Sequence, residues 1–583
     1  MGRRRMVGLF AALAWFGLAP TMARAQDSVV VIRPDQVGDT LSQANLPVDV
    51  IRRIIAIYND STTTRIAGSF ALPAGAHLEG RVAVYRGTLR VYGRIDGAVT
   101  VINGDVVVGA GGMIRGPVLV VGGRVDVRRG GGLDGEQTAY DPLAPVFRLP
   151  NGMLAFRERR KALSDLAAAR TSFQTGSINT TLSLETGRTF NRVEGLPIVF
   201  GPTFATQGPG TVDARLDVRG IFRPTTDRTK LRDDVGLVIG ADFRGAGKRR
   251  WLNFGGRAYR QILPFEEQPL SKGEAGWSAF LLQRDYRDHF ETRGAEGFLA
   301  FEPTRRFHLG VSYRRDLERS VPTSDPISVF RNQDAWRPNP LIDDGHYRTV
   351  KLWLDFDNRN DPIRPSTGWL IRADVEQSRS DDVSPVSLPA AIRAPIPTAN
   401  YRFSKLRFDI RRYARVDPSI RVNLRLTGAG WLGGDPLPIQ RRVSLGGPDI
   451  LPGYGFRDLN CAPSGFVDPA EASLCDRTLA AQVEVRTRLP ITIPFRIRNA
   501  DIAALQQILG IERAELVLMG NAGKAWLSGE GPGRVPNGRI PKFGEWDADI
   551  GVGLDTGGLG VYAAKSVAVS RPLRFVLRLQ RRF

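Results

Sequence analysis

From about residue 177 to the C-terminus, the chain repeats short segments in which apolar and polar residues alternate one by one. In the first clear example, Leu406 and Phe408 point to one side of a segment whose other positions are charged. Alternation with a period of two is typical of β-strands with two different faces. Such strands form either a soluble sandwich, whose polar face meets water, or a membrane barrel, whose apolar face meets lipid. The pattern alone does not separate these two classes, and it recurs in 405–413, 421–426 and 483–489.

The N-terminus has the three parts of a secretory signal peptide. Arg3 to Arg5 form a basic region, Val7 to Leu18 is an apolar stretch too short to span a bilayer, and Ala23 to Ala25 is an A-x-A cleavage site. We therefore expect residues 1–25 to be removed. The chain after residue 25 contains no run of 18 apolar residues, so we expect no transmembrane helix. Export together with many alternating segments favours the membrane barrel.

The strand candidates number about sixteen, an even number, as expected for a bacterial barrel. The last five lie near 479–489, 515–526, 546–555, 560–569 and 574–583. In the final segment the apolar residues share one face and end in an aromatic residue. This resembles the C-terminal β-signal of outer-membrane barrels, here formed by Phe575, Leu577, Leu579 and Phe583.

An internal repeat precedes the barrel segments. The triplets that begin at Leu78, Ile95, Ile114 and Leu133 each end in glycine and follow one another at spacings of 17, 19 and 19 residues. Short apolar strands lie between them. Short strands punctuated by glycine at a near-fixed period predict a stacked β-solenoid with repeats in 78–135. The segment resembles the right-handed β-helix of bactofilin-type polymer-forming proteins.

The domain organisation follows from these patterns. We predict a signal peptide over 1–25, a periplasmic β-solenoid over 26–136, a linker with a short helix over 137–176, and an outer-membrane barrel over 177–583. A short helix over 49–58 would begin at Asp49 as its N-cap. The basic, Ala-rich stretch 154–173 predicts a second helix, which either contacts lipid headgroups or packs at the barrel mouth.

Two further segments carry a family resemblance. Asp357 to Trp369 and Val443 to Tyr454, together with the terminal Phe583, resemble signatures of the BamA/TamA outer-membrane assembly superfamily, also called bacterial surface antigens. The resemblance covers 177–583. It implies an all-β fold, a 16-stranded antiparallel transmembrane β-barrel, and a role in inserting or translocating other molecules. Asp357 to Trp369 is expected to be a tight turn between two strands.

The second segment implies a long loop that folds back into the barrel. Family members carry an arginine before Gly453 that pairs with an acidic residue on the lumen wall, but Pro452 stands there in this chain. The resemblance then suggests Arg457 as the substitute and Glu484 as its partner; the alternative is that Arg457 is a solvent-exposed loop residue. The missing arginine puts full insertase activity in doubt. The expected loop lock comprises Gly446, Gly447, Gly453, Tyr454, Arg457 and Glu484.

A second departure concerns the N-terminal region. Family members usually carry periplasmic POTRA modules, and the β-solenoid occupies that place here. A solenoid edge can receive an incoming strand, and it can also stack on another copy or on an envelope scaffold. The sequence therefore allows two roles for the solenoid: delivery of a client to the barrel, and tethering to another copy or to an envelope scaffold.

Cysteine content and charge exclude several functions. Cys461 and Cys475 lie in one segment of an exported chain, so we expect a disulfide rather than a metal site. The formal net charge of +21 raises the question of nucleic acid. Arginines spread along alternating strands fit a charged lumen and anionic lipid headgroups better. We expect no nucleic-acid partner and no cofactor.

Catalytic motifs are also missing from the sequence. There is no G-x-S-x-G, H-E-x-x-H or P-loop, and the four histidines are scattered. We therefore expect a non-enzymatic outer-membrane protein that assists assembly or translocation of proteins or lipids. The alternative is a structural anchor or porin-like barrel that tethers the solenoid to the envelope. Expected partners are outer-membrane lipids, the machinery that inserts the barrel itself, a protein or lipid client, and further solenoids.

Overall fold

The computed structural model describes residues 48–140, 144, 146–148, 152–156, 168–186, 190–206, 212–224, 235–245, 251–265, 270–304, 306–331, 334–359, 365–417, 420–489, 514–556, 559–579 and 581–582. The chain divides into two units: Met1–Ala162 with Arg359–Ser366, and Leu163–Asn358 with Thr367–Phe583. The expected signal peptide, residues 1–25, lies outside the described residues. Each unit is considered by itself.

The first unit contains a β-solenoid, as the repeats predict. Successive coils stack in parallel, so that Val82 lies beside Val99, and Val99 beside Val118. Each coil contributes three strands, one more than the sequence indicates. The first sheet comprises β1 (Thr64–Ala67), β4 (Val82–Tyr85), β7 (Val99–Ile102), β10 (Val118–Val121) and β13 (Gln137–Tyr140). The second comprises β2 (Phe70–Leu72), β5 (Leu89–Val91), β8 (Val106–Val108) and β11 (Val125–Val127), and the third β3 (His77–Leu78), β6 (Arg94–Ile95), β9 (Met113–Ile114) and β12 (Gly132–Leu133).

The glycines of the repeat allow this stacking. A Cβ atom on Gly97 would lie 1.6 Å from the carbonyl oxygen of Gly80 in the neighbouring coil, and one on Gly116 would lie 2.2 Å from that of Gly97. Stacked valines, such as Val84 and Val101, fill the interior and are fully buried. The triplet period therefore records close contact between coils and not a chemical site.

Helix α2 (Val48–Asn59) covers the outer face of the first sheet. Its buried residues Ile51, Ile54 and Tyr58 pack against the sheet in one hydrophobic cluster with Tyr85. A hairpin of β14 (Val146–Arg148) and β15 (Leu154–Phe156) completes this cluster. The predicted helix is present, but it begins at Val48. Asp49 is its second residue and not its N-cap.

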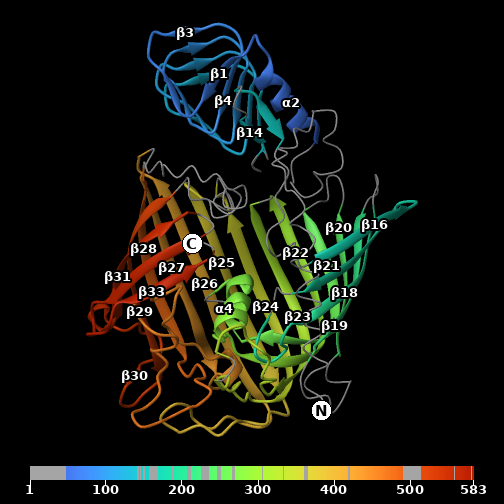
Figure 1. The fold of residues 1–583 in the computed structure, drawn as a ribbon, viewed down its shortest axis with the longest axis vertical. Helices are drawn as coiled ribbons and strands as arrows, with labels where there is room; N and C mark the ends of the chain where they lie inside the picture. Colours follow the sequence, from blue (N-terminus) through green and yellow to red (C-terminus); the bar gives the residue numbers. More distant parts are fainter. Residues whose placement is uncertain are drawn as a thin grey trace. The chain divides into compact units, whose positions relative to one another are not determined.

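The second unit is one large antiparallel sheet (Figure 1). In the described part of this unit, eighteen strands follow one another in chain order, and β30 is a two-residue strand that pairs in parallel with the end of β29. The other seventeen are antiparallel, one more than the resemblance implies. They are β16 (Ala168–Thr175), β17 (Ile178–Thr186), β18 (Ile198–Thr206), β19 (Val212–Phe222), β20 (Val235–Gly245), β21 (Leu252–Pro264), β22 (His289–Thr304), β23 (Phe307–Ser320), β24 (Gly345–Asp357), β25 (Gly368–Ser380), β26 (Tyr401–Arg415), β27 (Ile420–Gly434), β28 (Arg477–Arg488), β29 (Glu515–Ser528), β31 (Asp547–Asp555), β32 (Gly560–Ser566) and β33 (Arg574–Arg578), with β30 at Arg534–Val535.

The additional strand is β16, which lies in a segment where the sequence predicted a helix. Residues 154–173 were expected to be helical. Leu154–Phe156 is instead β15 and Ala168–Thr175 is β16, and residues 157–167 of the predicted helix lie outside the described residues. β16 pairs with β17 in register from Ala168 with Glu185 to Thr175 with Ile178. Sheet pairing therefore overrides the helix preference of the alanines.

The two faces of the large sheet have opposite character. Its large exposed side chains are apolar, for example Leu352 (54% exposed), Leu518 (52%) and Phe575 (74%). Its enclosed side carries fully buried charges such as Glu484 and Arg486. A soluble sandwich would bury the apolar face and expose the charged one. The reverse arrangement is that of a membrane barrel with a polar lumen.

Short helices lie in the connections of the barrel. Helix α4 (Lys272–Leu282) lies between β21 and β22, and 3₁₀ helices η3 (Ile439–Arg441) and η5 (Phe543–Glu545) lie in later loops. Among the described residues, no helix is long and apolar enough to cross a membrane. Figure 1 shows α4 in front of the wall strands, with β33 on one side of it and β18 and β19 on the other.

Candidate functional site in the barrel lumen

The connection between β27 and β28 fills a large part of the lumen. Residues 443–457 of this loop are buried or half-buried, and Leu451 is 0% and Tyr454 1% exposed. Gly446 (φ 107°) and Gly447 (φ 113°) have backbone conformations that favour glycine, and they begin the infolded segment. Residues 443–457 of this connection are therefore enclosed against the inner side of the sheet.

The tip of this loop lies against the last strands of the wall. The backbone N–H of Gly453 donates to Oδ2 of Asp549 on β31 at 2.8 Å. A Cβ at Gly453 would lie 2.7 Å from the Cβ of Asp549, so only glycine permits this approach. The Ser566 hydroxyl on β32 donates to the Tyr454 hydroxyl at 2.8 Å. Two of the predicted loop residues thus fix the tip to the wall.

Arg457 is buried, at 6% exposed, so it is not the solvent-exposed residue of the alternative prediction. Its guanidinium pairs with Asp288 and donates to the carbonyl of Glu471 at 2.7 Å. Glu484, the partner expected from the sequence, instead pairs with two other arginines. The expected Arg457–Glu484 pair is thus corrected to Arg457–Asp288. Asp288 precedes β22 by one residue and was not singled out in the sequence.

Asp288 is the centre of a buried charge cluster, defined here as Asp288, Arg192, Arg337 and Arg457. Its Oδ1 lies 2.6 Å from Nη2 of Arg192 and 2.7 Å from Nη2 of Arg337. Burial alone would raise the pKa of Asp288, but Arg457, Arg337 and Arg192 outweigh it and hold that pKa far below its usual range. The cluster therefore joins four connections of the barrel through one carboxylate.

Glu484 belongs to a second charge group on the wall. Its Oε2 lies 2.8 Å from Nε of Arg486, and its Oε1 lies 3.2 Å from Nη1 of Arg582. Arg486 also pairs with Asp555 at 2.6 Å. Arg582 comes from the C-terminal tail and is buried, and its Nη2 donates to the carbonyl of Asp449 at 2.8 Å. Glu484 thus pairs with a guanidinium from the end of the chain, that of Arg582, and not with one from the loop tip.

A third group connects the last strand to the loop and to α4. Arg578 on β33 pairs with Glu274 through Nε at 2.9 Å and Nη2 at 3.2 Å, and with Asp449 at 3.1 Å. Asp449 also pairs with Arg425 of β27 at 2.8 Å. Glu274 forms a capping box with Ser271 at the start of α4. Last strand, helix, loop and wall are therefore linked through buried ions.

The two cysteines lie at the far end of the same loop. Cys461 and Cys475 form a disulfide, and the backbone of Cys475 pairs with that of Val443 as an isolated bridge. Nearby, Arg442 pairs with Asp476 at 2.9 Å. These bonds close the loop on itself where it returns to β28.

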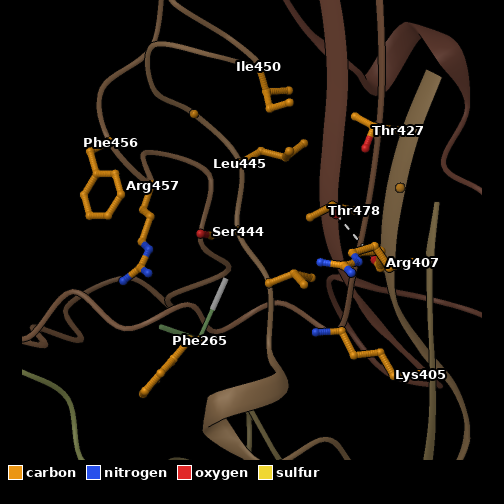
Figure 2. Close-up of a pocket in the computed structure, with 14 residues that line it drawn as sticks. Phe265, Lys405, Arg407, Thr427, Ser444, Leu445, Ile450, Phe456, Arg457 and Thr478 are labelled. Atoms are coloured by element: carbon orange, nitrogen blue, oxygen red, sulfur yellow. Dashed lines mark hydrogen bonds between the residues drawn. The ribbon is translucent and has the colours of Figure 1, made fainter. Parts of the chain in front are cut away.

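Two cavities lie between the loop and the wall. The first, of about 120 Å³, is lined by Leu445, Phe456 and Arg457 of the loop and by Lys405 and Arg407 of β26, which Figure 2 shows on the opposite side from Phe456 and Arg457. The second, of about 490 Å³, shares Arg407. It is strongly polar and is lined, among others, by Ser271, Glu274, Asp409, Asp449, Arg411, Arg425, Arg578 and Arg581. The lumen therefore holds two cavities around an ordered loop, and the larger of them is polar.

Some side chains near the C-terminus are exposed on the outer face of the sheet, and others are buried in the lumen. Phe575 (74% exposed), Leu577 (63%) and Leu579 (41%) are exposed, while Phe583 lies outside the described residues. β33 ends at Arg578, earlier than predicted. The cause lies in Arg578 and Arg582, whose side chains are held in the lumen.

Sequence reasoning found the loop glycines and Tyr454 but missed most of the charged partners. Long-range pairing cannot be read from local patterns; Asp288 and Arg457 lie 169 residues apart along the chain. Helix α4 was missed because it is short and lies among strands. Its capping box, Ser271 with Glu274, was the one local signal available.

One family model matches the central part of the barrel. Residues 275–496 match the Omp85 superfamily domain, a range that begins in α4 and includes β22 to β28 with the infolded loop. No curated protein matches the chain.

The solved structures that are similar to the chain include a BamA and two CdiB proteins. BamA from Haemophilus ducreyi lacking POTRA domains 1-3 has 13% identity, with 74% of each chain covered and a TM-score of 0.39. CdiB from Acinetobacter baumannii has 11% identity, 71% of this chain and 65% of that chain covered, and a TM-score of 0.29. CdiB from Escherichia coli has 9% identity, 70% and 62% covered, and a TM-score of 0.31. The chain thus spans less than two thirds of either CdiB chain.

Proposed function

We propose that this protein assists the assembly or translocation of proteins or lipids at the outer membrane. Its chain carries an Omp85 superfamily domain, and the protein is an outer-membrane barrel of that type. The role is non-enzymatic, and the client is handled at the side of the barrel. The observation that carries the proposal is the lumen, which is occupied by the infolded loop and its ion pairs.

The filled lumen argues for a lateral route and against a steady open pore. The loop is tied to the wall at its tip through Gly453 and Asp549, and at its start through Arg441, which pairs with Glu318 and with Glu376 at 2.9 Å. Removing one partner from a buried pair leaves an uncompensated charge, at a cost of about 3–5 kcal/mol. A client that passed through the centre would have to break several such pairs together.

The replacement of the loop arginine changes how the lumen lock is made. Pro452 carries no charge, and Glu484 is paired with Arg582 at 3.2 Å. In this proposal the C-terminal tail supplies the guanidinium of the lock. The position of the last strand and the position of the loop are then coupled through Asp449, which contacts both Arg578 and Arg582.

The second candidate function is an anchor, and the solenoid favours it. In the described part of the chain, β1 pairs with β4 at one end of the stack and β13 pairs with β10 at the other. The outer edges of these end strands are available for another strand. In the periplasm, where we place the solenoid, such edges would either receive a client or stack on further solenoids.

The test is the composition of outer membranes from cells with and without the protein, measured by quantitative proteomics and lipid analysis. Assembly or translocation predicts selective loss of one or a few barrels, lipoproteins or lipids, restored by the intact chain. An unchanged composition would reject this proposal. Altered envelope organisation with unchanged composition would then identify the anchor.

A further inference from the structure

The large sheet has two end strands, and they are held differently. Among the described strands, β16 pairs with β17 and β33 pairs with β32, and no ladder joins β16 to β33. β33 pairs with β32 only from Arg574 to Arg578. After it the chain turns inward, and Arg582 is 3% exposed. We call the line between β16 and β33 the seam.

Helix α4 contacts elements next to both sides of the seam. At its first turn, the Glu274 carboxylate binds the Arg578 guanidinium through two hydrogen bonds and accepts the backbone N–H of Leu579 at 2.8 Å. In its second half, Ala279 and Phe280 pack with Phe190, which lies between β17 and β18. The helix therefore connects the last strand to the first strands.

The composition of α4 suits a helix at an apolar boundary. After Glu274 it contains no charged residue, and its exposed side chains are Trp277 (40%) and Leu282 (43%). The neighbouring segment continues this surface, since the Val329 and Phe330 N–H groups donate to carbonyls of α4, and both side chains are exposed. An exposed apolar surface of this kind matches contact with hydrocarbon better than contact with a water-filled lumen.

We propose that α4 is a movable seal across the seam, and that the Glu274–Arg578 pair is the latch that holds it. Release of the latch frees α4 from the last strand, while its contacts with Phe190 act as the hinge side. The cavity of about 490 Å³ lined by Ser271, Glu274 and Arg578 then opens sideways toward the membrane. This inference rests on the proposed lateral function and adds the element that controls it.

The test measures how often α4 leaves its site. Ala279 is 0% exposed, and both native cysteines are in the disulfide, so Ala279→Cys supplies the single reactive thiol of the folded protein. Its rate of labelling by a maleimide, in purified protein in lipid vesicles, reports opening of α4. We expect Glu274→Gln to raise this rate about tenfold, because the buried Arg578 loses its charged partner on α4 and keeps only the one on the loop, Asp449.

Matched variants make the test decisive. Glu318→Gln removes another buried carboxylate, which pairs with Arg441 away from α4, and should leave the labelling rate unchanged. Arg578→Lys keeps the charge but loses the two-pronged geometry, so it should give an intermediate rate. Resistance to trypsin shows whether Glu274→Gln folds. If it does not fold, Arg578→Lys serves as the latch variant in its place.

Two results would overturn the inference. One is equal labelling for the latch variants and Glu318→Gln. The other is labelling of Ala279→Cys in the otherwise native protein as fast as that of Trp277→Cys at the exposed position. Because no client takes part, either result would reject the seal and leave the membrane-composition test of the proposed function untouched.

Discussion

At the scale of single residues, the lumen is organised by carboxylates that each serve several arginines. Asp288 binds Arg192, Arg337 and Arg457, and Asp449 binds Arg425 and Arg578. A guanidinium buried in a barrel needs such a partner, which is why the sequence predicted a partner for Arg457. It did not predict which one, because the choice depends on how distant connections meet in the lumen.

Loss of the central carboxylate should weaken the barrel. Asp288→Asn leaves three buried guanidinium groups without their shared anion, so we expect a loss of about 3–5 kcal/mol in the free energy of unfolding. Urea unfolding of the protein in lipid vesicles measures it. The control is Asp381→Asn, which removes an exposed pair with Arg348 and should cost less than about 1 kcal/mol. Equal effects of the two substitutions would show that the Asp288 cluster contributes no special stability.

A surface carboxylate of the solenoid should give a pH dependence. Hydrogen bonds from Arg94 and His77 lower the pKa of Asp96 to about 2. A lowered pKa in the folded state means that this stabilisation is present above the unfolded value, about 3.9, and is lost as the pH falls through about 2. Hydrogen exchange of β6 and β9, corrected for intrinsic rates, should show protection falling below about pH 4. Asp96→Asn should flatten this dependence, whereas Asp134→Asn should not.

At the scale of elements, periodic segments were predictable and isolated ones were not. The solenoid coils and the strands after Tyr454 follow repeated patterns, and β28, β29, β31 and β32 lie close to their predicted positions. Residues 168–173, the end of the predicted helix 154–173, form a strand. Their alanines favour helix locally, and their strand partner is recognised only in the folded sheet. The third strand of each coil was missed because it is only two residues long.

The close contact between coils gives a prediction for the solenoid. Gly97→Ala places a Cβ against the backbone of Gly80, which cannot move away as a flexible side chain would. We expect a loss of about 1–3 kcal/mol or more in solenoid stability. Hydrogen exchange measured by mass spectrometry should show lower protection in β4 and β7. Arg90→Ala changes an exposed position of β5 and should leave protection unchanged; a similar loss there would contradict the packing argument.

At the scale of the whole molecule, two features decide the interpretation. The large sheet exposes an apolar face and encloses charges, which identifies a barrel for a membrane. In the proposed function a client is handled at the side of the barrel, because the loop after β27 occupies the lumen. The sequence predicted the barrel and the infolded loop from alternation and from family signatures. The contacts of the C-terminal tail and α4 were beyond it, since they join residues about 300 positions apart.

The most direct test of lateral handling is photo-crosslinking in growing cells. A photoreactive residue replaces Leu577 on β33, at the seam (63% exposed). In a second strain it replaces Leu352 on β24, an exposed leucine (54%) in the middle of the sheet. If the client is handled at the seam, we expect discrete adducts from position 577 that contain the components lost from membranes of cells without the protein. From position 352 we expect only general lipid adducts. The same adduct pattern from both positions would contradict lateral handling.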